Sequence, residues 1–354
     1  MRGLLQVGQV ARTPVRIHWS TGLLPVAVLG WGLYSGIPAR GLAWLGIFVA
    51  ATLACVLLHE LGHAAAARWA GVRVHDIVLL PVGGAARLGS LPARPWQEAA
   101  VAFAGPLVNL AIAALLAPAL WIWPRYEWVP IPNNYDLGSM LVSLALFNAV
   151  VFAFNLLPAF PLDGGRLLRA TLCHWVPRLQ ATRIAAFVAR LVALAGLAYG
   201  TYEGSFLLVG FAAYVFVVAG REVRGAKVRA FLEDTRLGEV ALPVRVFDPE
   251  TPVADVRQHL RHHGQRGAVV ADECSPIGFV TPAMLAAADG ERHVGDLEMC
   301  AVVCHDSQAS LRELSLQFAE HPRSVAVEEI DRRPAGFVDL DILDECFRAY
   351  AKAA

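Results

Sequence analysis

Residues 41–67 form a long apolar stretch in which Glu60 is the single acidic or basic side chain. A helix of about 20 apolar residues crosses the hydrocarbon core of a bilayer. The stretch exceeds that length, so it predicts a membrane-spanning helix. An ionisable group inside such a helix is costly to bury and therefore indicates a functional site.

Glu60 belongs to the HExxH pattern His59-Glu60-Leu61-Gly62-His63. On a helix, residues four apart project from one face about one turn apart. Imidazoles at this spacing can bind Zn²⁺, and a glutamate beside them can act as general base. An ordinary helix with a hydrogen-bonded histidine pair is the alternative, since so short a pattern also arises by chance. The membrane setting favours the metal site.

The composition divides the chain into two unlike parts. The sequence is 56% hydrophobic and 17% charged, with a mean hydropathy of +0.49, which is more apolar than an average soluble protein. Of the 30 Asp and Glu residues, seven precede residue 221 and 23 follow it. We therefore predict a membrane domain over 1–220, a linker over 221–234 and a soluble part over 235–354. The net charge of zero and the lack of a basic, aromatic-rich patch indicate no nucleic-acid partner.

Apolar segments in the first part predict about six transmembrane helices. They cover residues 17–35, 42–69, 97–123, 137–158, 184–200 and 205–220. For the first, a cleaved signal peptide is the alternative, but the segment is long and begins with polar residues. Residues 72–88 are β-branched and interrupted by Gly and Pro, which predicts a short membrane-associated β hairpin with Gly83-Gly84 at its turn.

Arg and Lys gather on one side of this predicted bundle. With six spans, that side collects Arg2, Arg12, Arg16, Arg68, Arg73, Arg87, Arg94, Arg166, Arg169, Arg178, Arg183, Arg221, Arg224, Lys227 and Arg229. The other side has Arg40 and Arg125. By the positive-inside rule, we expect a multi-pass protein of the cell (inner) membrane with both termini cytoplasmic. His59 and His63 then lie toward the cytoplasmic end of their span.

The soluble part contains a weak internal repeat. Residues 266–281 and 323–339 each read as two strands joined by a turn. A helix-like run precedes each of them, at 253–263 and 311–321, and another follows, at 282–288 and 341–350. Two copies at a spacing of about sixty residues indicate a paired α/β module. We predict its units at 235–290 and 291–354.

A catalytic zinc usually has three protein ligands, so HExxH requires a third His, Glu or Asp. Asp163 is the leading candidate, because it lies just past the cytoplasmic end of the fourth predicted span, between Pro161 and Gly164. Asp76, Glu98 and His75 are the other candidates. The alternative role of Asp163 is that of a helix N-cap.

These motifs together resemble the site-2 protease family of intramembrane zinc metalloproteases. The resemblance rests on HELGH in a transmembrane helix and on the segment Asn155-x-x-Pro158-x-x-x-Leu162-Asp163-Gly164, and it extends to Gly105-Pro106-Leu107-Val108-Asn109. It implies that His59, His63 and Asp163 bind one Zn²⁺ and that Glu60 is the catalytic acid/base. It also implies that Asn155 positions substrate or stabilises the oxyanion.

The paired C-terminal repeat is similar to that of the branch carrying cystathionine-β-synthase (CBS) domains. In those domains a Ser/Thr-x-x-Asp motif often holds the ribose of an adenosine nucleotide. Here Met284 replaces the Asp after Thr281, and Asp339-Leu340-Asp341-Ile342 lacks both the hydroxyl and the final Asp. These departures argue against nucleotide binding and leave regulation by another signal, or homodimer formation, as the expected role.

The resemblance therefore implies a zinc metalloendopeptidase that cleaves single-pass transmembrane substrates near their cytoplasmic end within the lipid bilayer. Membrane-tethered transcription factors and anti-sigma factors are the substrates that the family suggests. A CBS-regulated transporter or channel is the alternative, because intramembrane charges also mark ion paths. A zinc-binding but inactive scaffold is a further alternative, which the presence of Glu60 disfavours.

The six cysteines show no disulfide framework, which suits a reducing cytosol. Cys300, Cys304 and His305 have the spacing of half a metal site. No second pair at ligand spacing accompanies them, so buried thiols are the favoured interpretation.

Overall fold

The computed structural model describes residues 4–10, 13–80, 83–89, 92, 94–122, 136–272, 275–321, 323–331 and 333–353. The chain forms two compact units, Met1–Val223 and Arg224–Ala354. The boundary falls within helix α8 (Phe206–Asp234), so the predicted linker, 221–234, is helical.

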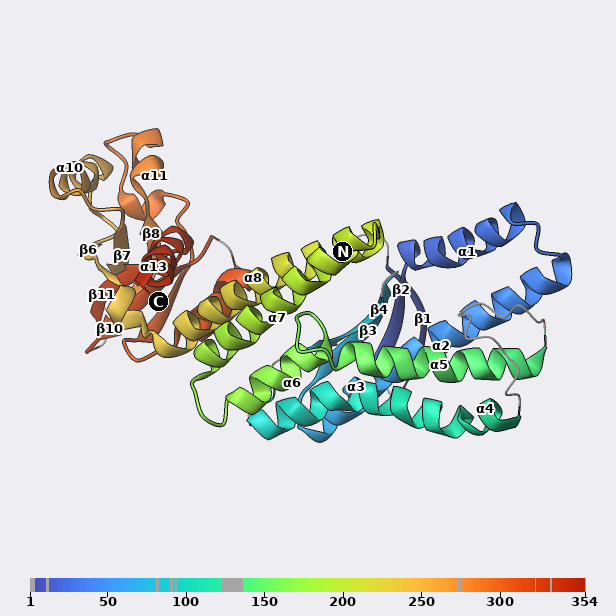
Figure 1. Cartoon of the computed structure of the whole chain (residues 1–354). Helices are drawn as coiled ribbons and strands as arrows, with labels where there is room; N and C mark the ends of the chain where they lie inside the picture. Colours follow the sequence, from blue (N-terminus) through green and yellow to red (C-terminus); the bar gives the residue numbers. More distant parts are fainter. Residues whose placement is uncertain are drawn as a thin grey trace. The chain divides into compact units, whose positions relative to one another are not determined.

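Five helical segments in the described parts are long and apolar enough to cross a membrane. They are α2 (Ala39–Trp69), α3 with α4 (Pro95–Leu116 and Pro118–Ile122), α5 (Leu137–Asn155), α7 (Arg178–Tyr202) and α8. Figure 1 shows these helices together with the shorter α6 (Asp163–Leu172). The predicted α-helical membrane bundle is confirmed.

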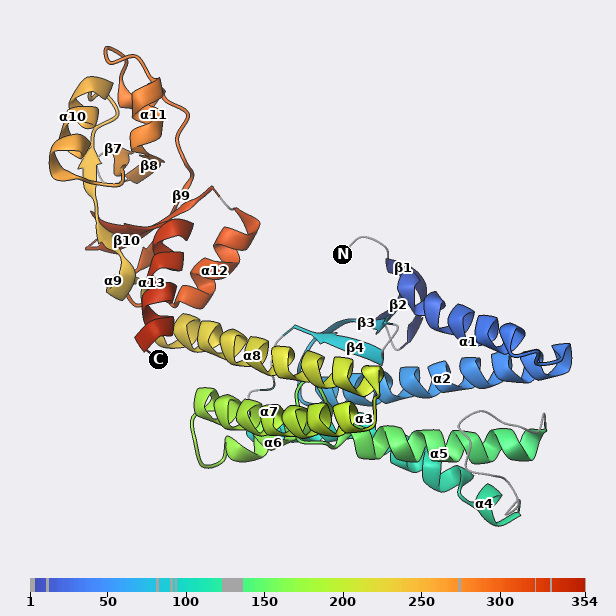
Figure 2. The ribbon, with the colours of Figure 1, turned by 45° about the horizontal axis from the view of Figure 1, so that its top comes forward.

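The first of the six predicted spans is wrong in its extent. Residues 13–18 form a strand and 19–22 a 3₁₀ helix, and only then does α1 run over Leu23–Tyr34. Twelve helical residues rise about 18 Å, less than the hydrocarbon thickness of about 30 Å. Gly36, with φ +73°, then turns the chain into α2, and α1 and α2 form a helical hairpin (Figures 1 and 2).

A four-stranded sheet lies beside the C-terminal end of α2. Its order is β1 (Leu4–Val10), β2 (Thr13–His18), β3 (Val74–Leu80) and β4 (Gly83–Leu88). The predicted hairpin over 72–88 therefore forms, but two N-terminal strands extend it. Gly83 and Gly84 are paired with Leu80 and Leu79, so the prediction that they form the turn is wrong.

The pairing of β2 with β3 places the N-terminal strands beside the segment that follows α2. These strands are parallel, so residues 15–17 lie beside 77–79, directly after α2. Thr21 Oγ1 also donates to the carbonyl of Leu79 at 2.9 Å. From the side of the membrane bundle on which α2 ends, α3 and α7 run away, and α5 and α8 run back toward it. Within the first unit, Glu222 of α8 lies 3.5 Å from Arg169 of α6, so this part of α8 returns to that side, whatever the length of α1.

The second unit repeats a strand–helix–strand–strand–helix pattern. The first copy comprises β6 (Arg245–Phe247), α10 (Val253–His263), β7 (Ala268–Asp272), β8 (Ser275–Val280) and α11 (Pro282–Ala287). The second comprises β9 (Val302–Asp306), α12 (Leu311–Glu320), β10 (Val325–Ile330), β11 (Arg333–Val338) and α13 (Leu340–Ala353). A short helix, α9 (Leu237–Val240), and the strand β5 (Leu242–Pro243) precede both copies, and β5 pairs with β11. The predicted paired α/β repeat is confirmed in its elements.

The two repeats share one apolar core. It contains Val269 and Phe279 of the first copy together with Leu314, Val327 and Phe337 of the second. The rings of Phe279 and Phe337 lie 4.7 Å apart between centroids. Neither repeat buries this surface alone, which explains why the two copies form one unit.

Candidate metal centre

Helix α2 supplies the two histidines and the glutamate of the HExxH pattern. All three side chains are buried inside the first unit. The i, i+4 spacing brings the imidazoles to a ring-centroid distance of 4.7 Å, with the planes nearly perpendicular. The Glu60 carboxylate lies beside β4, where the amide of Ala86 donates to its Oε2 at 3.0 Å.

Helix α6 supplies Asp163 as the first residue of its first turn. The chain leaves α5 at Asn155 and turns through Leu156–Leu162, which include a cis Phe160–Pro161 peptide and the fully buried Phe160 ring. Asp163 is itself buried. Its side chain makes no N-cap hydrogen bond, because the cap position is Leu162. Its carboxylate points instead at α2.

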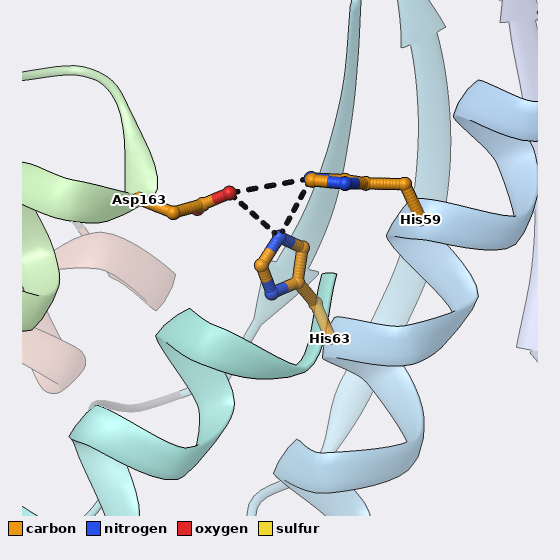
Figure 3. A group of neighbouring side chains, drawn as sticks. All are labelled: His59, His63 and Asp163. Atoms are coloured by element: carbon orange, nitrogen blue, oxygen red, sulfur yellow. Dashed lines mark hydrogen bonds and ion pairs between the residues drawn. The ribbon is translucent and has the colours of Figure 1, made fainter. Parts of the chain in front are cut away.

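Three side-chain atoms from these two helices meet at one point, as Figure 3 shows. Asp163 Oδ2 lies 3.2 Å from Nε2 of His59 and 3.2 Å from Nε2 of His63, and the two Nε2 atoms are 3.1 Å apart. The structure therefore brings together the three residues that the sequence analysis proposed as ligands. In the described parts of the chain, this is the one group of three such residues with converging ligand atoms.

The donor set fits a zinc ion. The Nδ1 atom of His63 lies 2.7 Å from the carbonyl oxygen of Val101, which can only accept, so the proton of a neutral ring is on Nδ1. The Nε2 lone pair of His63 then faces another nitrogen and a carboxylate oxygen. Such acceptor atoms repel one another unless a cation or an added proton lies among them. Two imidazoles and one carboxylate are a ligand set that catalytic zinc accepts.

Gly105 of α3 leaves the space that this group needs. A β-carbon built at Gly105 would lie 2.3 Å from His63 Nε2 and 2.7 Å from His59 Nε2. Those contacts are far inside the van der Waals limit, so any side chain at this position would occupy the space in front of both nitrogen atoms. Gly84 does the same for Glu60, because its β-carbon would lie 2.3 Å from Glu60 Cγ.

The other candidates for a third ligand form ion pairs elsewhere or lie outside the converging group. Asp76 is paired with Arg16 at 2.8 Å across the β2–β3 ladder and with Arg87 of β4. Glu98 is paired with Arg169 at 2.7 Å and with Arg178. His75 is exposed on β3. None of the three belongs to the converging group.

Asn155 is hydrogen-bonded within its own helix in this structure. It is the last residue of α5, and its side-chain amide donates to the carbonyl of Val151 one turn earlier at 3.1 Å.

Two other asparagines, which the sequence analysis did not propose as site residues, lie behind His59. Asn109 Oδ1 is 2.5 Å from His59 Nδ1, and Asn109 Nδ2 donates to Asn148 Oδ1 at 2.8 Å. Both are amide side chains within long apolar helices, and this was the signal in the sequence.

The half-site pattern in the second unit shows no metal-binding geometry. His305 Nε2 lies 2.7 Å from the side-chain oxygen of Gln317, and Cys304 is the third residue of β9. Partial burial and a hydrogen bond to Glu329 raise the pKa of the Cys304 thiol to about 12. A metal-binding cysteine requires the thiolate, so this environment opposes ligation.

Comparison with known proteins supports a protease family. The profile of peptidase family M50 matches residues 47–128 and 131–199, which include both ligand segments. The zinc metalloprotease MJ0392 of Methanocaldococcus jannaschii is 28% identical over 326 residues, which cover 92% of this chain and 91% of the relative. The putative zinc metalloprotease Rip3 of Mycobacterium tuberculosis is 33% identical over 63% of this chain and 59% of its own length.

A solved structure, the site-2 protease from Methanocaldococcus jannaschii, is 32% identical and covers 62% of this chain and 95% of its own, with a TM-score of 0.46. The family profile, the relatives and the membrane helices together identify the chain. It belongs to peptidase family M50, the site-2 proteases, and is a multi-pass membrane zinc metalloprotease.

Proposed function

We propose that His59, His63 and Asp163 bind one Zn²⁺ per chain and that Glu60 is the general base and acid of peptide hydrolysis. The convergence of three buried ligand atoms within 3.2 Å of one another, from helices about a hundred residues apart in sequence, is the observation that carries this proposal. When bound, the zinc ion supplies a Lewis acid that polarises the scissile carbonyl and lowers the pKa of water toward about 7.

Glu60 then moves the proton that hydrolysis requires. It takes a proton from the attacking water and returns it to the leaving amine. The amide of Ala86 holds one carboxylate oxygen, Oε2, which leaves Oε1 for the water. The chain around Glu60 therefore orients the base rather than leaving it to rotate.

Asn155 is proposed to contact substrate. The family resemblance assigns it a role in positioning substrate or stabilising the oxyanion. Its place at the C-terminal end of α5, eight residues before Asp163, supports this assignment. To reach substrate, its amide must give up the bond to Val151.

The proposed substrates are single-pass transmembrane proteins, for example membrane-tethered transcription factors or anti-sigma factors. Peptide bonds inside a substrate helix are shielded by its own hydrogen bonds, so the helix must unwind locally. The sheet offers an edge for the extended segment by β-addition. Strand β3 lies inside the sheet, so the edge beside Glu60 is β4. Proline substitutions along residues 83–88 that leave cleavage unchanged would remove this role.

We propose that the ligands lie toward the cytoplasmic side of the inner membrane, with both termini in the cytoplasm. The side of the bundle on which α2 ends is also the side where Arg and Lys gather, which supports this orientation. Substrates should then be cut near their cytoplasmic boundary. Mass spectrometry of the cleavage products tests this, and a cut at the outer leaflet would be the contrary result.

The second unit is proposed to regulate the protease or to form a homodimer. A cleft of about 870 Å³ lies in this unit and is lined by Met284, Arg292, Met299 and Arg323, among others. Met284 stands where a ribose-binding Asp is expected, and its thioether cannot replace that acceptor pair. Adenosine nucleotide is therefore a poorly matched ligand for this cleft, and titration with ATP and AMP should show no binding at micromolar concentration.

The variant Glu60→Gln tests the proposed chemistry directly. It removes the base but keeps the size of the side chain and all three ligands. We expect loss of cleavage of a transmembrane reporter substrate, with zinc content unchanged. Thr52→Val, which alters a polar residue elsewhere on α2, is the control and should retain both. Cleavage by the Glu60→Gln protein would refute the assignment of the base.

A further inference from the structure

The two histidines of the metal centre obtain their orientation in different ways. His63 Nδ1 is hydrogen-bonded to the backbone carbonyl of Val101. This carbonyl presents an acceptor whatever side chain occupies position 101. His59 Nδ1 is bonded to a side chain, Asn109 Oδ1, at 2.5 Å. An amide side chain presents an acceptor or a donor according to its rotation by 180°. The role of His59 as a ligand therefore depends on which way Asn109 faces.

A chain of hydrogen bonds fixes that direction. Asn148 Nδ2 lies 2.9 Å from the carbonyl of Leu144, which can only accept, so Asn148 must donate there. Its Oδ1 is consequently the acceptor for Asn109 Nδ2 at 2.8 Å. Asn109 then turns its Oδ1 to His59, and Nδ1 of His59 carries the proton. The backbone carbonyl of Leu144 thus sets the direction of all three hydrogen bonds.

We propose that Asn109, oriented by Asn148, is the positioning residue that keeps His59 in the tautomer with Nε2 unprotonated and aimed at Asp163. The inference rests on the proposed zinc site and adds two residues on other helices, α3 and α5. Both side chains are fully buried, with 0% exposure, so water does not replace either partner. Hydrogen-bond partners of this kind fix the tautomer and ring orientation of metal-binding histidines.

The positioning role of Asn109 predicts a result that a packing role of the same residue does not predict. Without Asn148, the Asn109 amide is free to turn its NH₂ toward His59, which favours the wrong tautomer. An aspartate at 109 has no donor and accepts from His59 in either rotation. Asn109→Asp should therefore make Asn148 dispensable for zinc binding.

The test is zinc affinity of the purified full-length protein in detergent, measured by competition with a fluorescent zinc chelator. We expect Asn109→Leu and Asn148→Leu each to bind zinc about 10- to 100-fold more weakly than the wild type. The double variant Asn109→Asp/Asn148→Leu should recover most of the affinity that Asn148→Leu loses. Ser143→Ala, another buried polar position on α5, should bind like the wild type. Thermal unfolding of the metal-free proteins identifies variants that simply fail to fold.

The outcomes separate this inference from the proposed function. Wild-type affinity in Asn109→Leu, or a double variant as weak as Asn148→Leu alone, would overturn the positioning role and leave the zinc site intact. A wild-type protein with no zinc affinity would overturn the zinc site and the inference together. The absorption spectrum of the cobalt-substituted proteins gives a second readout, because loss of the His59 ligand changes the coordination of the ion.

Discussion

Gly105 shows how strongly one residue limits this metal centre. Its α-carbon lies so close to His59 and His63 that a methyl group would stand 2.3 Å from His63 Nε2. No other residue type leaves this space, although Gly costs roughly 0.5–1 kcal/mol relative to Ala inside a helix. The close approach of α3 to the ligands thus takes precedence over helix propensity.

We expect Gly105→Ala to abolish zinc binding and cleavage while the helices still form. The methyl group takes the space in front of both Nε2 atoms, so the two histidines and Asp163 cannot bind an ion together. Gly46→Ala on α2 is the matched control, because nothing lies within 4 Å of its built β-carbon. Zinc content and circular dichroism of the two proteins measure this. Equal zinc content in both would show that Gly105 does not adjoin the ion.

Cys304 offers a second prediction at this scale. Its thiol has a pKa raised to about 12 by burial and by Glu329, against an ordinary value of about 8.5. Only the thiolate reacts rapidly with iodoacetamide, so alkylation of Cys304 should be slow at pH 8 and still rise beyond pH 10. Glu329→Gln should lower the pKa and speed the reaction. Peptide mass spectrometry over a pH series checks both expectations.

The sequence predicts part of the site well. Helical spacing alone places His59 and His63 together, and the scarcity of acidic residues in the membrane part points to Asp163. The contacts of Asn109 and Asn148 could not be predicted in the same way, because they depend on the rotation of α3 and α5 about their axes. That rotation is set by packing between segments distant in sequence, which local patterns do not contain.

At the scale of elements, a buried cluster of charges holds α6, the helix that begins with Asp163. Glu98 of α3 accepts from Arg169 of α6 and from Arg178 at the start of α7. Arg169 also lies 3.5 Å from Glu222 of α8 and 5.4 Å from the centre of the Phe160 ring. Glu98 and Arg169 are both buried, so neither charge has water as a substitute partner.

Glu98→Gln should destabilise the protein and weaken zinc binding. Breaking a buried ion pair typically costs about 3–5 kcal/mol, because it leaves an uncompensated charge. Loosening α6 would also displace Asp163 from the two histidines. Asp344→Asn, which breaks the exposed pair with Arg348, is the control and should cost at most about 1 kcal/mol. Thermal unfolding with and without zinc compares them, and equal melting temperatures would contradict the structural role of the cluster.

The elements themselves were predicted unevenly. The predicted helix over 253–263 coincides with α10, and 311–321 differs from α12 by one residue, because amphipathic periodicity is strong there. The strands β1 and β2 were missed, since β2 is defined by its pairing with β3, some sixty residues later. Hydropathy also overestimated the first span, because residues 17–22 belong to the end of β2 and to a 3₁₀ helix that precedes α1.

At the scale of the whole molecule, the side on which the chain ends lie can be tested independently of catalysis. The loop between α7 and α8, around Glu203, should face the outside of the cell, and the second unit should face the cytoplasm. In intact cells, an impermeant maleimide should label Glu203→Cys. Asp248→Cys, an exposed position in the second unit, should be labelled only after permeabilisation. The reverse pattern would invert the proposed orientation.

The most direct measurement of the proposed centre is the zinc content of the purified full-length protein and of its Asp163→Ala variant. Asp163 is the ligand contributed by α6, and the other two come from α2, so its removal tests whether the two helices share one ion. We predict about one zinc per chain in the wild type, and a large loss of both zinc and reporter cleavage in the variant. Full zinc content and full cleavage in Asp163→Ala would contradict the shared metal centre.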